Sequence, residues 1–240
     1  MTWTLRAVAV AALAGPAVLT APNAWAGPFG TSWAAPWEQP SVVTLDPLRG
    51  RVCEKCDLSA RMMSGARLSD GKFGGSDFSS SSMERANGAN SVFDEADFTR
   101  ADLSQAKLMK GQFVRARFAG AVMRGADASG ANLERADFTN AELGGATFSQ
   151  ASLNEARFLA TRARDASFLR AGLRRADFTL AILQGADFSG ADLYNAQFDR
   201  ANLSGANLAD ARNLTQKQLR NACGDGETRL PTGLSVQPCH

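Results

Sequence analysis

Apolar side chains recur at every fifth residue along most of the chain. From Cys53 to Leu208, a five-residue register runs without a gap through 32 central positions, of which phenylalanine fills 13, leucine 12 and methionine 3. Alanine occupies 23 of the 32 positions that lie two residues before a centre. A period of five fits neither an α-helix nor a simple strand. It therefore predicts an array of small units that stack on one another.

The repeat is clearest near the C-terminal end, where pentads such as Ala176-Asp-Phe-Thr-Leu and Ala201-Asn-Leu-Ser-Gly follow one another. This pattern resembles the pentapeptide-repeat family, whose repeat reads A(D/N)LXX, strongly over residues 64–210 and weakly over 51–63. The resemblance implies an all-β fold, a right-handed quadrilateral parallel β-helix in which four pentads make one square coil. The small and the large apolar residue of each pentad would point inward, and the other three would face water.

A second period of 20 residues supports four pentads per coil. The centres spaced by 20 residues are leucine at Leu58 and then phenylalanine seven times in succession, from Phe78 to Phe198. Residues 20 apart would stack in one column, about 4.8 Å from each other, the spacing of neighbouring strands. The sequence thus predicts a ladder of seven phenyl rings within about eight coils.

The N-terminal segment predicts export. Residues 1–26 read as a signal peptide, with an apolar stretch over 7–19 and small residues at Ala24 and Ala26, so cleavage is expected after Ala26. This favours a periplasmic or secreted protein with no transmembrane span after cleavage, and an organelle lumen is left open. Residues 27–50, which contain four prolines, are expected to form an extended leader.

The repeat needs a closure at each end, because an open coil exposes unpaired backbone groups. We expect the β-helix to cover residues 51–210. Its first coil, 51–64, is expected to be irregular, because Arg51 and Arg61 occupy small inward positions. Residues 211–240 are expected to form a short helical cap, beginning at about Thr215, and a tail that ends at Cys239.

The four cysteines fall into two pairs at opposite ends of the predicted rod. An exported chain favours disulfides, and the expected bonds are Cys223–Cys239 and Cys53–Cys56. The Cys53-Glu-Lys-Cys56 spacing also allows a thiol-redox role, although the register places both sulfurs inward. A zinc site is rejected because the two pairs lie too far apart.

The charge balance argues against a nucleic-acid partner. The chain carries a formal charge of +2, and residues 51–210 contain 20 basic and 20 acidic side chains. Only one histidine, the terminal His240, and one tyrosine, Tyr194, are present. No catalytic, cofactor-binding or metal-binding set is therefore predicted, and no cofactor is expected. The aspartates that precede many centres are expected to be exposed structural residues: Asp77, Asp97, Asp137, Asp177, Asp187 and Asp192.

Basic residues supply the candidate interaction patch. One coil carries several arginines, and a column of the 20-residue period carries others, beside Glu95 and Glu155, so salt-bridge ladders are expected. The candidate residues are Arg115, Arg135, Arg162, Arg164, Arg170, Arg174 and Arg175. Two interpretations stay open: a solvated face with weak surface pairs, or a patch for an acidic protein, a polysaccharide or a lipid head group. Outward apolar residues are few: Val122, Leu159, Leu180 and Ile182.

These observations predict a non-enzymatic scaffold or protein-interaction module with an unknown protein partner. A thiol-redox role through Cys53 and Cys56 is the first alternative. A second comes from the resemblance, because some pentapeptide-repeat proteins resemble duplex DNA and bind topoisomerases. Such mimicry requires a strongly acidic face, so the neutral repeat and the export signal disfavour it. An end-to-end homodimer through an incompletely capped coil is left open.

Overall fold

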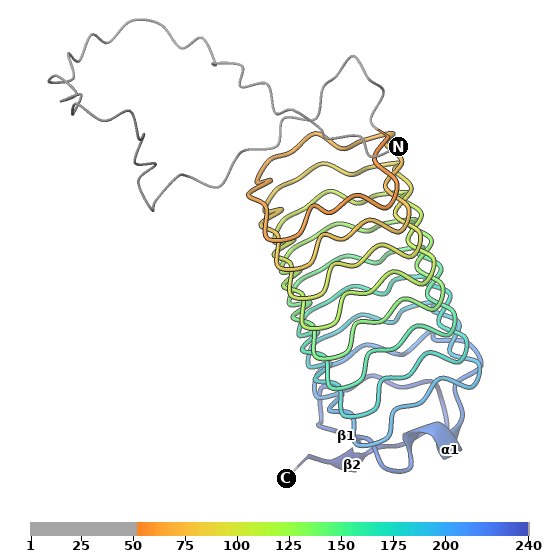
Figure 1. Ribbon diagram of the computed structural model, residues 1–240. Helices are drawn as coiled ribbons and strands as arrows, with labels where there is room; N and C mark the ends of the chain where they lie inside the picture. The colour runs from red at the N-terminus through yellow and green to blue at the C-terminus, as the bar shows by residue number, and fades with distance from the viewer. Residues whose placement is uncertain (1–51, 240) are drawn as a thin grey trace, which may run out of the picture. The chain divides into compact units, whose positions relative to one another are not determined.

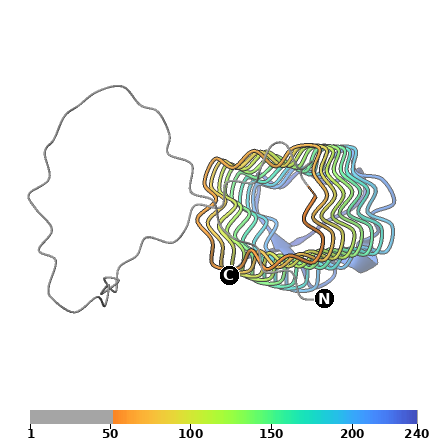
Figure 2. The ribbon, with the colours of Figure 1, turned by 45° about the horizontal axis from the view of Figure 1, so that its top comes forward.

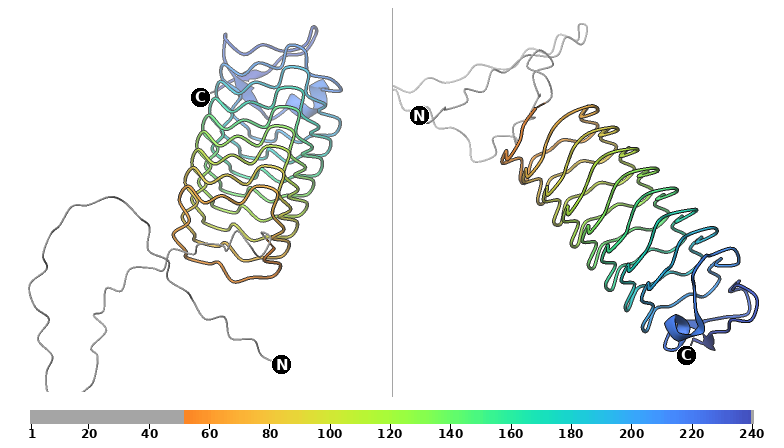
Figure 3. Two further views of the ribbon diagram at one scale, coloured as in Figure 1. Left: turned by 90° about the horizontal axis from the view of Figure 1, so that it is seen from above. Right: turned by 90° about the vertical axis from the view of Figure 1, so that its right-hand side faces the viewer.

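A computed structural model describes residues 52–239, which form a four-sided parallel β-helix (Figures 1 and 2). One residue of each pentad bridges in parallel to the residue 20 positions further on, from Val52 with Lys72 to Asp192 with Arg212. The coils stack along one axis (Figure 3). The four-sided parallel β-helix with four pentads per coil is therefore confirmed. The predicted signal peptide (1–26) and leader (27–50) lie outside the described residues.

The pentad satisfies all five of its backbone N–H groups, and the stretch around Phe138 shows how. The Phe138 and Asn140 N–H groups donate to carbonyls of the following coil at 2.7 and 2.9 Å, and the Asp137 N–H donates to the preceding coil at 3.0 Å. The Ala141 N–H closes a turn on the Phe138 carbonyl at 2.9 Å. The remaining N–H, that of Thr139, donates to the Asp137 side chain at 2.9 Å. The D/N of the repeat thus completes the backbone hydrogen bonding.

Each pentad ends in a corner residue with a left-handed backbone. Every fifth residue from 55 to 205 has a φ between +52° and +69°. Nine of these corners are glycine, and the others include bulky residues such as Leu180, with φ 62°. A non-glycine residue in this region costs about 1–2 kcal/mol. The stacked hydrogen bonds on both sides of the corner must therefore enforce it.

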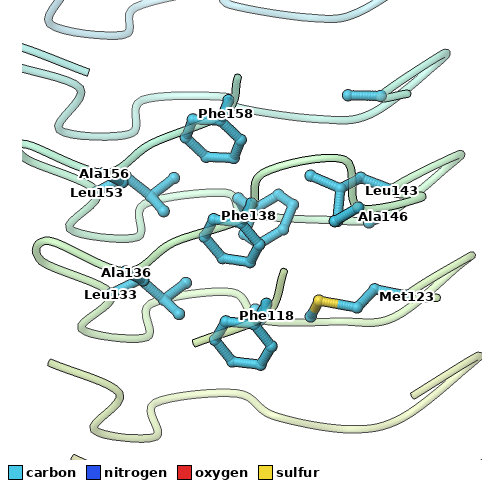
Figure 4. Close-up of a cluster of buried hydrophobic side chains, with 14 of the residues drawn as sticks. Phe118, Met123, Leu133, Ala136, Phe138, Leu143, Ala146, Leu153, Ala156 and Phe158 are labelled. Atoms are coloured by element: carbon cyan, nitrogen blue, oxygen red, sulfur yellow. The ribbon is translucent and has the colours of Figure 1, made fainter. Parts of the chain in front are cut away.

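The phenylalanine ladder runs through the interior as predicted (Figure 4). Neighbouring rings from Phe78 to Phe198 stack with centroids 4.6–5.2 Å apart and planes within 3–9° of parallel. A second, shorter column accompanies it on one side as Phe73, Phe93 and Phe113, and on another side as Phe148, Phe168 and Phe188. Six successive coils consequently hold two phenylalanines each.

Three of the four centres that depart from the large apolar type, Gly88, Ala128 and Ala163, belong to coils with two phenyl rings. A Cβ at Gly88 would lie 3.1 Å from Cε2 of Phe93 in the next coil. The Phe93 ring therefore occupies the space that a larger side chain at Gly88 would need.

The first coil is regular, which corrects the prediction that residues 51–64 are distorted. Val52, Asp57 and Met62 bridge to the second coil in the same register as the later pentads. Arg61 occupies a small inward position and stays half-exposed. Among the described residues no coil precedes this one. A side chain at this end of the stack is therefore not enclosed from both sides, and a charged group is tolerated there.

Beyond the last regular coil, a short helix replaces one side of the square. Helix α1 (Gln216–Leu219) has Thr215 as its N-cap, which agrees with the predicted start. The Gln218 side chain accepts a hydrogen bond from the Thr215 N–H at 2.9 Å. Its amide nitrogen also donates to the carbonyls of Leu193 and Ala196 at 2.8 Å each. The helix is thereby fixed to the eighth coil.

The chain then returns to the stack in two short strands. Strand β1 (Cys223–Gly224) continues the column of Asn202, and β2 (Gln237–Pro238) pairs with β1 in parallel as the outermost strand. Pro238 stands where regular pentads place a central residue, whose N–H donates outward to the next coil, as Leu203 does to Cys223 at 2.7 Å. Because proline has no N–H, this edge cannot donate to a further strand.

Candidate functional site

The aspartates predicted to be exposed structural residues do serve the backbone, and the structure places them half-buried. Each of the six accepts a hydrogen bond at its Oδ1 from the N–H two residues later, at 2.8–3.2 Å: Asp77, Asp97, Asp137, Asp177, Asp187 and Asp192. Two of them also meet arginines of the next coil, Arg117 at 3.5 Å and Arg157 at 3.8 Å. One carboxylate oxygen of each is therefore already engaged, and none of the six lines the two clefts described below.

The arginine column forms the predicted salt-bridge ladder. Arg115 meets Glu95 at 3.2 Å, and Glu155 is held between Arg135 at 2.8 Å and Arg175 at 3.5 Å. The hydrogen bond and the charge of Arg135 hold the pKa of Glu155 below its usual range. All five side chains are accessible to solvent, so the ladder contributes little to stability. It does pair three arginines of the candidate patch with two glutamates, which leaves one net positive charge.

The arginines between residues 162 and 175, in the sixth and seventh coils, do not gather into one patch. The pentad register places Arg162 and Arg164 on one side, Arg174 and Arg175 on the opposite side, and Arg170 at a corner between. Arg162 approaches Glu142 at 4.0 Å, Arg174 bonds Asp192 at 2.8 Å, and Arg164 bonds the Gln184 side chain. Arginines that are close in sequence thus lie on different sides of the β-helix, whereas charged residues 20 positions apart lie in one column.

Both predicted cysteine pairs are bonded. The Cα atoms lie 5.5 Å apart for Cys53–Cys56 and 4.8 Å for Cys223–Cys239. The Cys53–Cys56 turn is partly buried, and the Ser76 hydroxyl of the next coil bridges it, donating to the Cys53 carbonyl at 2.5 Å and accepting from the Cys56 N–H at 3.1 Å. No helix N-terminus of the described residues adjoins this turn, since α1 lies at the opposite end. The turn therefore lacks the helix N-terminus that activates the thiolate in redox motifs of this spacing.

The exposed apolar side chains are scattered. Leu180 and Ile182 are 40% and 37% exposed at one corner, and Val122 and Leu159 are half-buried. Sequence reasoning missed Val52 and Met62, which are exposed on the first coil, and Tyr194, whose ring lies 6.0 Å from the Arg174 guanidinium carbon. Single exposed apolar residues are normal on a protein surface.

The clearest clefts in the described residues adjoin the C-terminal segment. One, of about 330 Å³, lies between α1 and the tail and is lined by Gln216, Lys217, Leu219, Arg220, Ser235, Val236 and Gln237. The other, of about 400 Å³, is lined by Ser204, Gly224, Asp225, Gly226, Val236, Pro238 and Cys239. Sequence reasoning missed both, because they arise where the tail folds back over the last coil.

Two family profiles match the sequence. The pentapeptide repeat region matches residues 131–208, and the eight-copy pentapeptide repeat matches 72–108 and 112–140. Together they cover more than half of the 240 residues. The chain is a parallel β-helical solenoid, and it belongs to the pentapeptide-repeat family.

Several solved structures are similar to this chain. Full-length QnrB1, a plasmid-mediated fluoroquinolone resistance protein, is 20% identical over 73% of this chain and 82% of its own, with a TM-score of 0.41. HetL from the cyanobacterium Nostoc sp. strain PCC 7120 is 27% identical over 78% and 94%, with a TM-score of 0.26. A pentapeptide repeat protein from the Arabidopsis thaliana thylakoid lumen is 28% identical over 46% and 83%, with a TM-score of 0.22. No curated protein sequence matches the chain.

Residues 52–239 contain no helix with the length and hydropathy that crossing a bilayer requires. In the same part of the chain, no three or more histidine, cysteine or acidic side chains come together as a metal site would need.

Proposed function

We propose that this protein is a non-enzymatic interaction scaffold whose partner is another protein. The observation that carries the proposal is that most polar side chains of the β-helix bond other groups of the same chain. The aspartates bond their own turns, most of the patch arginines bond side chains of adjacent coils, and the clearest clefts adjoin the terminal segment. Solenoids of this kind offer long, flat faces for partners.

The compartment is part of the proposal. A signal peptide over 1–26, cut after Ala26, would deliver the protein to the periplasm or the medium, with an organelle lumen as the alternative. The two disulfides are compatible with an oxidising compartment of this kind.

The C-terminal segment is proposed to act as the helical cap of a right-handed solenoid. Leu219 and Ala222 are each 1% exposed and extend the core beyond the last regular coil. The cap ends the stack on an edge without an outward N–H at Pro238, which disfavours an end-to-end homodimer at this end of the rod.

The scaffold function is tested by crosslinking in intact cells that export the tagged protein, followed by pull-down and mass spectrometry. One enriched envelope protein is expected. Arg174→Glu with Arg175→Glu then tests the arginine patch, and Arg117→Glu with Arg157→Glu is the matched control on the neighbouring side. Retention of the partner by both variants would exclude the arginine patch. Absence of any enriched protein would contradict the scaffold function itself.

The thiol-redox alternative predicts that the Cys53–Cys56 bond cycles. Alkylation of free thiols in intact cells, before and after a mild reductant, distinguishes a structural disulfide from a redox-active one. A bond that stays oxidised supports a structural tie; a population of free Cys53 and Cys56 in untreated cells would favour the alternative. The neutral charge of the repeat disfavours the alternative of a topoisomerase-binding DNA mimic, because such a mimic needs an acidic face.

A further inference from the structure

The excess positive charge of the chain resides in its C-terminal segment. Residues 51–210 are balanced at 20 basic and 20 acidic side chains, whereas residues 211–240 contain four basic and two acidic ones. The basic residues are Arg212, Lys217, Arg220 and Arg229. None of them makes an ion pair with a described residue, while nine arginines of the solenoid do.

The segment contains only two acidic residues, and neither pairs with these cations. Asp225 accepts hydrogen bonds from the Gly205 N–H at 2.8 Å and from the Thr228 N–H and hydroxyl at 3.1 Å each. Glu227 is exposed and appears in no ion pair of the described residues. The charge of the four cations is therefore left to solvent or to a ligand.

Two of the four cations line the cleft between α1 and the tail. Lys217 stands on α1 and Arg220 is the C-cap of this helix, and the half-buried Val236 contributes apolar surface to the same cleft. The cleft is held open in a fixed shape, because Gln216 bonds the Ser235 carbonyl at 2.9 Å and N–H at 3.0 Å. A cleft of about 330 Å³ that joins two cations to aliphatic surface suits a carboxylate with an apolar neighbour.

A peptide that binds here would contact the side chains of the cleft and would not add a strand to the sheet. The outermost strand, β2, ends in Pro238 and offers no N–H there. A peptide would therefore have to fill the cleft instead of extending the sheet. A bare inorganic anion would leave the half-buried Val236 uncovered, so the lining favours a peptide over a free anion.

From these features we infer that the α1–tail cleft binds an acidic segment of a partner protein, in which a glutamate or aspartate neighbours an aliphatic residue. The inference rests on the proposed scaffold function and locates its binding site. Lys217 and Arg220 contact the carboxylate, and Val236 contacts the aliphatic side chain.

The test uses the mature exported protein and a defined probe. The probe is the acetylated, amidated octapeptide Gly-Glu-Leu-Glu-Gly-Leu-Glu-Gly, and the control peptide has glutamine in place of every glutamate. Binding is followed by calorimetry at low salt and by the methyl resonances of Val236. Lys217→Gln with Arg220→Gln removes the cleft cations. Arg212→Gln with Arg229→Gln removes the same charge from residues that line neither cleft.

The expected result is an affinity for the acidic peptide that falls about tenfold in the cleft variant and less than twofold in the control variant, with methyl shifts only for the acidic peptide. Equal losses in both variants would show net charge alone and overturn the cleft site. Binding of phosphatidylglycerol vesicles without binding of the peptide would overturn the peptide assignment. In the pull-down, a partner retained by the cleft variant contradicts this site alone, whereas no partner in the wild type contradicts the scaffold function.

Discussion

The solenoid body and the C-terminal segment use the same kinds of residue for different purposes. In the body, Asp137 bonds the Thr139 N–H and Glu155 bridges two arginines, so polar groups are satisfied by neighbours one coil or two residues away. In the C-terminal segment the register breaks at α1, and Lys217 and Arg220 line a cleft without an ion-pair partner among the described residues. The strict period of the body therefore pairs most polar side chains with neighbouring coils, whereas cations without an ion-pair partner among the described residues occur where the period ends.

Removal of one ring from the phenylalanine ladder should have the largest effect. Phe138 stacks between Phe118 and Phe158 at 4.9 Å on each side. Phe138→Ala is expected to destabilise the protein by about 3–5 kcal/mol, because it leaves a cavity between coils that cannot collapse. Urea unfolding measures the loss. Phe138→Leu, the residue of the leucine centres, should cost less than about 1.5 kcal/mol, and an equally small loss for alanine would show that the ladder does not hold the body together.

Loss of the tail disulfide should act on the C-terminal segment alone. Replacement of Cys223 and Cys239 by serine is expected to cost about 3 kcal/mol, because the bond closes a loop of 16 residues. Hydrogen exchange should show lost protection at β2 and unchanged protection in the body. The matched control, serine at Cys53 and Cys56, should cost about 1.5 kcal/mol, because its loop spans 3 residues. Loss of protection throughout the body would mean that the tail is essential to the solenoid.

The role of the repeat's aspartate can be separated from its charge. Asp137→Ala leaves the Thr139 N–H without its acceptor and is expected to cost about 1 kcal/mol. Asp137→Asn keeps the oxygen and should be nearly neutral, although it loses the weak pair with Arg157. Thermal unfolding measures both. An alanine variant as stable as the asparagine variant would show that the hydrogen bond from the Thr139 N–H to the Asp137 side chain does not stabilise the pentad.

Acid should loosen the tail turn at Asp225. The Gly205 N–H, followed by the Thr228 hydroxyl and N–H groups of the turn, holds the pKa of Asp225 below its ordinary 3.8 against the opposing effect of desolvation. A carboxyl with a lowered folded pKa stabilises the fold above its unfolded pKa, and this stabilisation is lost as pH falls through the folded value. The Gly205 amide should lose protection below pH 3.8. With Asp225→Asn, which does not titrate, this pH dependence should disappear, and its persistence would point to another group.

The repeat was predictable because it is local and redundant. A five-residue period with alanine and a large centre identifies the coil, and the phenylalanines from Phe78 to Phe198 identify the stacking column before any coordinate is known. The salt-bridge ladder at Glu155 followed from the same 20-residue period. The prediction of a distorted first coil was wrong, because it assumes that Arg61 is enclosed. The end of the stack leaves this side chain half-exposed.

The coil and its columns can be predicted from the sequence, because they depend on contacts repeated at fixed separations along the chain. The pairing of the cysteines follows from their grouping at the two ends of the repeat, and the neutral charge of the body follows from composition. The fold alone reveals where the C-terminal segment returns to the stack, that Lys217 and Val236 line one cleft, and that Pro238 forms the outer edge. These contacts occur once, between residues without a common period, so they depend on how the chain folds back over the last coil.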